Sequence, residues 1–286
     1  MFVPKVEPER IPGYWYGRKG GPLMPTTSIP SGQKVFHFLH GGGYIQLSAH
    51  SNDMTSNIIR TLVDLDDSAP HTLSSEYRLT ATAPLPGQNP FPAALLDALA
   101  GYNYLVNEIE YSPPDTILVG DSLGGNLALV LTRYFVESKN TPTASLLVPP
   151  GHLILLSHLA GLTTTHDWPG SSTSSNTTDY LEFHGTGRSL YSKIALLGPF
   201  DLGFAFHDGY VSLLRCFPHT VKLISEAFLA TGTAERMYDA TRTLERKMAA
   251  EMGEGQVTYF EGKDAAHDFL VFTWYPCRPA ALEAIW

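Results

Sequence analysis

Short apolar runs alternate with amphipathic stretches along most of the chain. Strands are predicted where β-favouring residues cluster, at 34–39, 71–77, 116–119, 153–156, 227–231 and 257–260. Helices are predicted where apolar residues recur at helical spacing, at 53–63, 92–105, 126–136 and 237–248, with a closing helix from about Pro279. This order predicts an α/β fold with a mostly parallel central sheet and helices on both faces.

Two parts of the chain depart from the alternation. Residues 1–33 are rich in proline and glycine, which predicts an irregular arm with room for one short strand. Residues 158–217 combine a polar stretch with a poorly patterned apolar one, which predicts a loop and lid-like helices. We therefore expect a single domain over 1–286 that carries 158–217 as an insertion. Only about forty residues precede the first glycine loop, so we expect a small, reduced lid and an open pocket.

Composition narrows the class of protein. Nineteen Lys and Arg residues face 28 Asp and Glu residues, a net charge of −9, which argues against nucleic acid as the partner. Apolar residues make up 43% of the chain, enough for a sizeable core. Cys216 and Cys277 are far apart and form no CxxC motif, which favours a reducing compartment. Without a membrane-spanning apolar run or a secretory signal, we expect a soluble cytoplasmic protein.

The segment Gly120-Asp121-Ser122-Leu123-Gly124 matches the pattern G-x-S-x-G between a predicted strand and a predicted helix. A serine on such a tight turn adopts a strained backbone conformation that exposes its hydroxyl, and the helix directs its N-terminal amides toward an anion there. Ser122 is therefore the predicted nucleophile. The alternative is a serine that only caps the helix.

The segment His40-Gly41-Gly42-Gly43-Tyr44 follows another predicted strand. Consecutive glycines let backbone N–H groups turn inward, as an oxyanion hole requires. We expect the amides of Gly41, Gly42 and Gly43 to act together with the amide of Leu123, the residue after the nucleophile. A flexible turn is the competing interpretation. A phosphate cradle is another, but no G-x-x-x-x-G-K-[ST] motif follows.

A serine nucleophile needs a base, and the base needs an acid that holds it. His267 lies in a loop after the last predicted strand, where the third member of such a triad falls in chain order. Glu235 follows the strand at 227–231 and is the favoured acid. Asp239 and Asp264 are its competitors.

Four blocks of the chain resemble the α/β-hydrolase esterases of the hormone-sensitive-lipase and arylacetamide-deacetylase-like group: 40–44, 76–79 with 89–94, 120–126 and 265–269. The resemblance implies Ser122 as nucleophile, His267 as base and Glu235 at the position of the acid. Leu123 stands where the group usually has alanine, and His158 lies where a Ser-Pro-Trp-like block is usual. We therefore expect Tyr44, Leu123 and His158 to line the substrate pocket.

The predicted function is that of a serine carboxylesterase that hydrolyses small to medium acyl esters without a metal or cofactor. An amidase, lactamase or formamidase would use the same triad. A protein of another class, an inactive hydrolase-fold binder of small ligands, remains the second alternative. Since the base must be neutral, activity is expected to fall as pH drops through the range of histidine, about 6.5.

Overall fold

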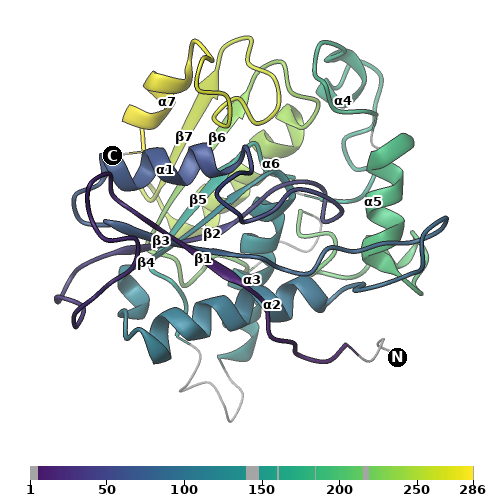
Figure 1. Ribbon diagram of the computed structural model, residues 1–286. Helices are drawn as coiled ribbons and strands as arrows, with labels where there is room; N and C mark the ends of the chain where they lie inside the picture. The colour runs from purple at the N-terminus through teal and green to yellow at the C-terminus, as the bar shows by residue number, and fades with distance from the viewer. Residues whose placement is uncertain (1–5, 140–147, 160, 184, 215–218, 286) are drawn as a thin grey trace.

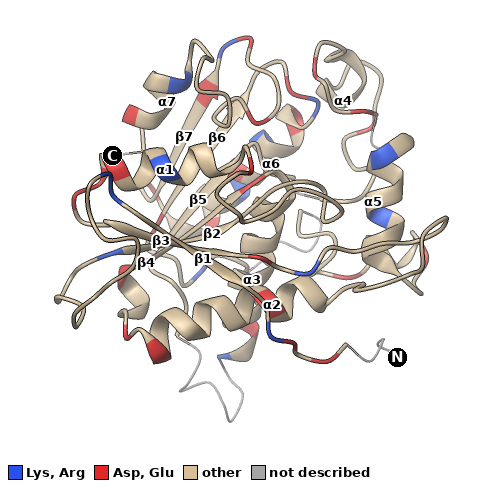
Figure 2. Ribbon diagram, viewed as in Figure 1, with Lys and Arg blue, Asp and Glu red and all other residues tan. Residues whose placement is uncertain are grey.

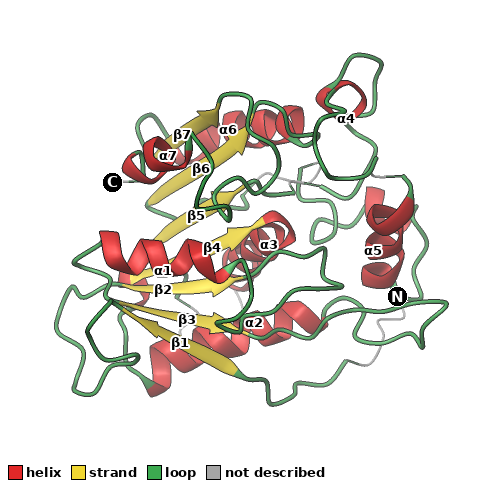
Figure 3. Cartoon of the chain, turned by 45° about the horizontal axis from the view of Figure 1, so that its top comes forward, coloured by secondary structure: helices red, strands yellow, loops and turns green. Residues whose placement is uncertain are grey.

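A computed structural model describes residues 6–139, 148–159, 161–183, 185–214 and 219–285 (Figure 1). These residues form one seven-stranded sheet with the strand order β1-β3-β2-β4-β5-β6-β7 (Figure 3). The strands are β1 (Gly13–Gly17), β2 (Val35–Leu39), β3 (His71–Ser75), β4 (Thr116–Asp121), β5 (His152–Leu156), β6 (Glu226–Gly232) and β7 (Val257–Gly262). Only β1 runs antiparallel to its neighbour, so the predicted mostly parallel sheet is confirmed.

Helices cover both faces of the sheet. They are α1 (Ser56–Leu65), α2 (Ala93–Asn103), α3 (Ser122–Ser138), α4 (Ser172–Ser175), α5 (Gly187–Leu197), α6 (Tyr238–Met252) and α7 (Arg278–Glu283). Apolar residues of α1 and α7 pack into the core on one face, and those of α2, α3 and α6 pack into the core on the other. This is the three-layer arrangement that alternating strands and helices predict.

The central strands are buried on both faces, which explains their continuous apolar runs. In β4, Ile117 and Val119 face the core beneath α1, whereas Leu118 faces the core beneath α3. The same alternation recurs in β5 and β6. Polar residues within these strands are buried too: His37 of β2 is fully buried, and its Nε2 lies 2.9 Å from Ser75 Oγ of β3.

Several boundaries differ from the predicted ones. The helix expected from Asp53 begins at Ser56, because the Asp53 carboxylate accepts hydrogen bonds from the amide and hydroxyl of Thr55 and forms a turn there. The helix expected from Asn126 begins at Ser122, directly at the end of β4. The turn between β4 and α3 is therefore shorter than the sequence pattern predicted.

The predicted insertion at 158–217 lies between β5 and β6, and its described residues carry α4, α5 and a short 3₁₀ turn at Phe204–Phe206. Residues 160, 184 and 215–217 of this segment, with Cys216 among them, lie outside the described residues. Its role as a lid stays a prediction. In the ranges given above, no helix is both long enough and apolar enough to cross a membrane.

Two histidines inside the fold predict how stability depends on pH. His37 and His158 are fully buried, and burial lowers the pKa of each to about 3. The unfolded chain takes up these protons near pH 6.5, whereas the folded protein does not. The contribution of these two histidines to stability is therefore full above pH 6.5 and falls toward pH 3, by about 1.4 kcal/mol per pH unit for each histidine.

The substitution His158→Leu tests this, because neither ring nitrogen of His158 has a hydrogen-bond partner among the described residues. Urea unfolding between pH 7.5 and 4.5 should show a shallower loss of the free energy of unfolding in the variant, by about 1.4 kcal/mol per pH unit. Parallel pH profiles for the two proteins would contradict the assignment.

Candidate active site

Ser122 lies at the sharp turn between β4 and α3. Its backbone φ is +50°, a left-handed conformation that residues other than glycine rarely adopt. The turn is tight because α3 crosses the end of β2 closely: a Cβ at Gly124 would lie 2.0 Å from the carbonyl oxygen of Leu39. The first residue of α3 therefore projects from the carboxyl edge of the sheet, with the positive end of the helix dipole behind it.

His267 reaches Ser122 from the loop after β7. Its Nε2 lies 2.9 Å from Ser122 Oγ, and the ring is buried, with 1% of the residue exposed. On the other side of the ring, Nδ1 lies 3.3 Å from Glu235 Oε2. A hydroxyl from the start of α3, an imidazole from the loop after β7 and a carboxylate from the loop after β6 thus form one continuous chain of hydrogen bonds.

Glu235 is fixed in place by further donors. Its Oε1 accepts hydrogen bonds from Ser157 Oγ at 2.7 Å and from the amide of Gly232 at 2.5 Å. Burial raises the pKa of Glu235, whereas His267 and these two donors act in the opposite direction by favouring the carboxylate. The carboxylate is therefore held in one orientation toward the imidazole.

The two competing acids point elsewhere. Asp239 Oδ2 accepts a hydrogen bond from the amide of Ser172 at 2.7 Å and so anchors the start of α4. Asp264 is exposed, and its amide donates to Thr233 Oγ1. Of the three predicted candidates, the structure places only Glu235 beside His267.

The glycine loop after β2 is supported from behind by the second sequence block. The Tyr77 hydroxyl donates to the His40 carbonyl at 2.6 Å, and the two rings stack at 4.3 Å between centroids. The amide of Thr80 donates to the Tyr44 carbonyl at 2.7 Å. The block at 76–79 thus positions the loop that follows β2.

Gly41 does not fit the predicted oxyanion hole. Its amide donates to Asp121 Oδ1 at 2.9 Å, so that N–H is unavailable to a substrate oxygen. Gly42, at φ +100°, and Gly43 line the pocket beside Ser122, and neither amide donates to another residue in the described ranges. Leu123 also lines the pocket, and as the second residue of α3 it has no intrahelical acceptor for its N–H.

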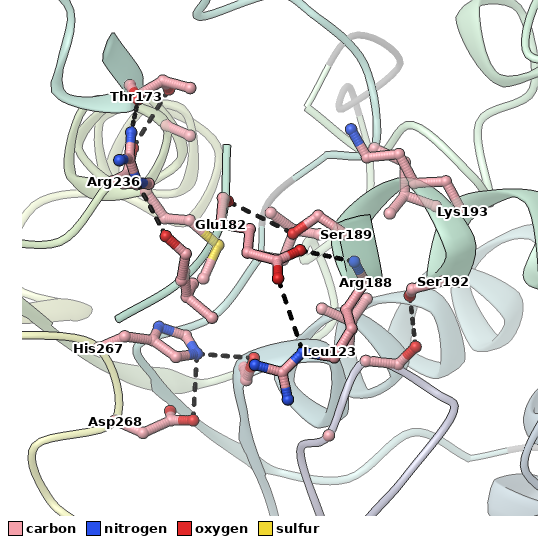
Figure 4. A pocket seen from close by; sticks show the side chains of 18 of the residues that line it. Leu123, Thr173, Glu182, Arg188, Ser189, Ser192, Lys193, Arg236, His267 and Asp268 are labelled. Carbon is pink, nitrogen blue, oxygen red and sulfur yellow. Dashed lines mark hydrogen bonds and ion pairs between the residues drawn. The ribbon is translucent and has the colours of Figure 1, made fainter. Parts of the chain in front are cut away.

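A cavity of about 370 Å³ opens in front of Ser122 (Figure 4). Leu123 lines it, as predicted, but Tyr44 and His158 do not. The Tyr44 hydroxyl instead donates to Asn126 Oδ1 within the core. His158 is buried behind α3, where a Cβ at Gly125 would meet it at 2.5 Å. Both side chains turn away from the pocket although their neighbours in sequence face it.

The alpha/beta hydrolase fold family matches residues 36–271, which include every residue of this arrangement. The chain belongs to this family. The esterase LipU of Mycobacterium tuberculosis is 32% identical to this hydrolase-fold chain over 113 residues, 40% of the chain. The match spans about a third of LipU's length, 34%.

Solved structures resemble this hydrolase-fold chain over most of its length. EstE5 soaked with ethyl alcohol is 25% identical, with a TM-score of 0.67 over 89% of this chain and 75% of that one. An esterase/lipase from an uncultured bacterium is 26% identical, with the same TM-score and coverage. An esterase of the bacterial hormone-sensitive lipase family, 23% identical with a TM-score of 0.66 over 88% and 74% of the two chains, shares the fold. The resemblance inferred from the sequence blocks is confirmed.

A second carboxylate, that of Asp268, lies beside the predicted base His267 in this α/β-hydrolase. Asp268 Oδ2 lies 3.1 Å from His267 Nε2, the same nitrogen that faces Ser122. Burial alone would lower the pKa of His267, but the carboxylates of Asp268 and Glu235 together raise it well above its ordinary value of 6.5. The imidazolium form is therefore strongly stabilised at this site.

Three residues that shape the surroundings of His267 were not predicted from the sequence. Asp268 directly follows the predicted base, and this adjacency is the sequence signal that indicates it. Asp179 Oδ1 accepts a hydrogen bond from the amide of His267, and its Oδ2 accepts one from the amide of Arg236. The ring of Tyr180 meets the imidazole edge-on at 5.7 Å. Asp179 and Tyr180 carried no sequence signal, because they lie in the polar part of the insertion.

Proposed function

We propose that the chain is a serine carboxylesterase, with Ser122 as nucleophile, His267 as base and Glu235 as the acid that holds it. The continuous hydrogen-bonded chain from Ser122 Oγ through His267 to Glu235 carries the proposal. Similarity to proteins described as esterases supports the ester as the bond that is cleaved. Because Ser122, His267 and Glu235 are all present and in contact, an active enzyme is favoured over an inactive binder.

Each group has one task in the proposed reaction. Ser122 Oγ attacks the carbonyl carbon while His267 Nε2 takes the hydroxyl proton, and Glu235 stabilises the resulting imidazolium. The amides of Gly42, Gly43 and Leu123 bind the oxyanion. His267 then protonates the departing alcohol, and a water activated by the same imidazole hydrolyses the acyl-enzyme.

The substitution Ser122→Ala tests the nucleophile. We expect hydrolysis of p-nitrophenyl acetate, butyrate and octanoate to fall at least about 10⁴-fold in kcat, because the covalent step is lost. The wild type should show a burst of p-nitrophenol equal to the enzyme concentration if deacylation is slow. Equal rates for the two proteins would refute the proposal, and p-nitroanilides of the same acids would measure amide cleavage separately.

The substitution Glu235→Gln tests the acid. The amide cannot stabilise the imidazolium, so we expect kcat to fall about 10³- to 10⁴-fold with a small change in KM. Asp239→Asn is the matched control, because it removes the same charge from the competing carboxylate and should change kcat less than about tenfold. If the two variants ranked in the opposite order, the role would pass to Asp239.

The substitution Asp268→Asn tests the electrostatics of the base. His267 acts in its neutral form, so kcat/KM falls as pH drops through its pKa, and the raised pKa places that limb above 6.5 in the wild type. Removing the Asp268 charge should move the limb to lower pH. Asp264→Asn removes a nearby exposed charge and should leave the limb in place. An unchanged limb in Asp268→Asn would contradict the assigned cause.

A further inference from the structure

Lys193 is a buried cation on the wall of the active-site cavity. It belongs to α5, whose eleven residues include two basic side chains and no acidic one (Figure 2). Only 6% of Lys193 is exposed, and the residue lines the cavity. Within the described ranges its ammonium forms no hydrogen bond and no ion pair.

An ammonium in this position is costly to the fold. Burial lowers the pKa of Lys193 to about 8, although the charge of Asp167 acts in the opposite direction. The group therefore remains mostly protonated at neutral pH. Buried charges are normally paired, and an unpaired one destabilises the folded protein. Stability alone does not explain a lysine here.

The other charged groups on the cavity wall differ from Lys193 because they already have partners. Glu182 Oε1 lies 3.9 Å from Arg188 Nε, and Asp268 faces His267. The Arg236 guanidinium donates to the backbone carbonyls of Leu181 and Thr173. Asp167 has interactions of its own as well. The ammonium of Lys193 is therefore the charged donor on the cavity wall that is available to bind an anion.

The position of Lys193 indicates which part of a substrate would reach it. In Figure 4, Lys193 lies on the opposite side of the cavity from His267 and Asp268. Asp268 lies beside the reacting atoms at one end of the cavity, whereas the Lys193 ammonium lies at the other end, where Asp167 is the carboxylate whose charge acts on it. The helix that carries Lys193 is held in place, because the Tyr191 hydroxyl and the backbone of Thr82 exchange hydrogen bonds of 3.1 Å.

We propose that Lys193 binds a carboxylate at the end of the substrate remote from the scissile ester, so that the preferred substrates are half-esters of dicarboxylic acids or similarly anionic esters. This inference rests on the proposed esterase function. The ammonium and the carboxylate would form a charge-assisted hydrogen bond in a site shielded from water.

Matched pairs of esters test the preference. Monoethyl adipate, suberate and sebacate carry the carboxylate at increasing distance, and the same ethyl esters ending in a carboxamide are their neutral isosteres. Hydrolysis is followed by proton release in a pH-stat at pH 7. We expect the wild type to favour the carboxylate of at least one length about 10- to 100-fold in kcat/KM.

The substitution Lys193→Met should abolish this preference while retaining hydrolysis of the carboxamide esters. Lys222→Met removes the same charge from an exposed lysine outside the cavity and should keep the wild-type preference. Lys193→Met should also unfold at an equal or higher temperature than the wild type, because it removes an unpaired buried charge. A wild-type enzyme that hydrolyses the carboxamide esters equally well or better at every length would overturn the inference.

Binding without turnover separates this inference from the proposed function. The three half-esters are titrated calorimetrically into Ser122→Ala and into Ser122→Ala/Lys193→Met. Binding of a half-ester that is weakened about tenfold or more by the second substitution supports the inference even if no ester is ever hydrolysed. Equal affinity in the two variants overturns it, and the proposed esterase activity would stand on its own measurements.

Discussion

The close crossing of α3 over the ends of β2 and β4 determines the geometry of the whole site. Gly124 meets the carbonyl of Leu39 with no room for a side chain, and the strained backbone of Ser122 persists because α3 is almost entirely buried behind it. At the same crossing, Asp121 accepts the amide of Gly41. One contact between a helix and two strands therefore directs the hydroxyl and positions the glycine loop.

The electrostatic character of the site follows from how many acids surround one imidazole. Glu235 and Asp268 both approach His267, and Asp121 lies close enough for the charge of Asp268 to contribute to its raised pKa, after burial. The carboxylates of Glu235 and Asp268 stabilise the imidazolium, but their negative field opposes an oxyanion formed nearby. The amides of Gly42, Gly43 and Leu123 would have to counter that field at short range, which makes their alignment more important than in a neutral site.

The sequence predicted the fold and the chain order of the site because both depend on local patterns. Strand and helix periodicity predicted the layers, and the positions of Ser122, Glu235 and His267 after the parallel strands β4, β6 and β7 placed them at one edge of the sheet. The directions in which individual side chains and backbone amides point could not be predicted from the sequence. The use of the Gly41 amide depends on the Asp121 side chain, which comes from another strand. Tyr44 and His158 adjoin residues of the site, yet core packing turns them inward.

Helix α5 of the insertion contacts the glycine loop after β2. Ser192, next to the buried Lys193, donates a hydrogen bond to the carbonyl of Gly43. The turn of α5 that carries the ammonium therefore also supports the loop that would bind the oxyanion. Binding energy raises the rate only when it acts more strongly in the transition state than in the ground state. Because a substrate group held at Lys193 acts on the helix turn that positions Gly43, contacts at the remote wall can influence kcat as well as KM. With a substrate carboxylate bound to Lys193 as proposed, one turn of α5 would connect the group that sets substrate preference with the carbonyl of Gly43.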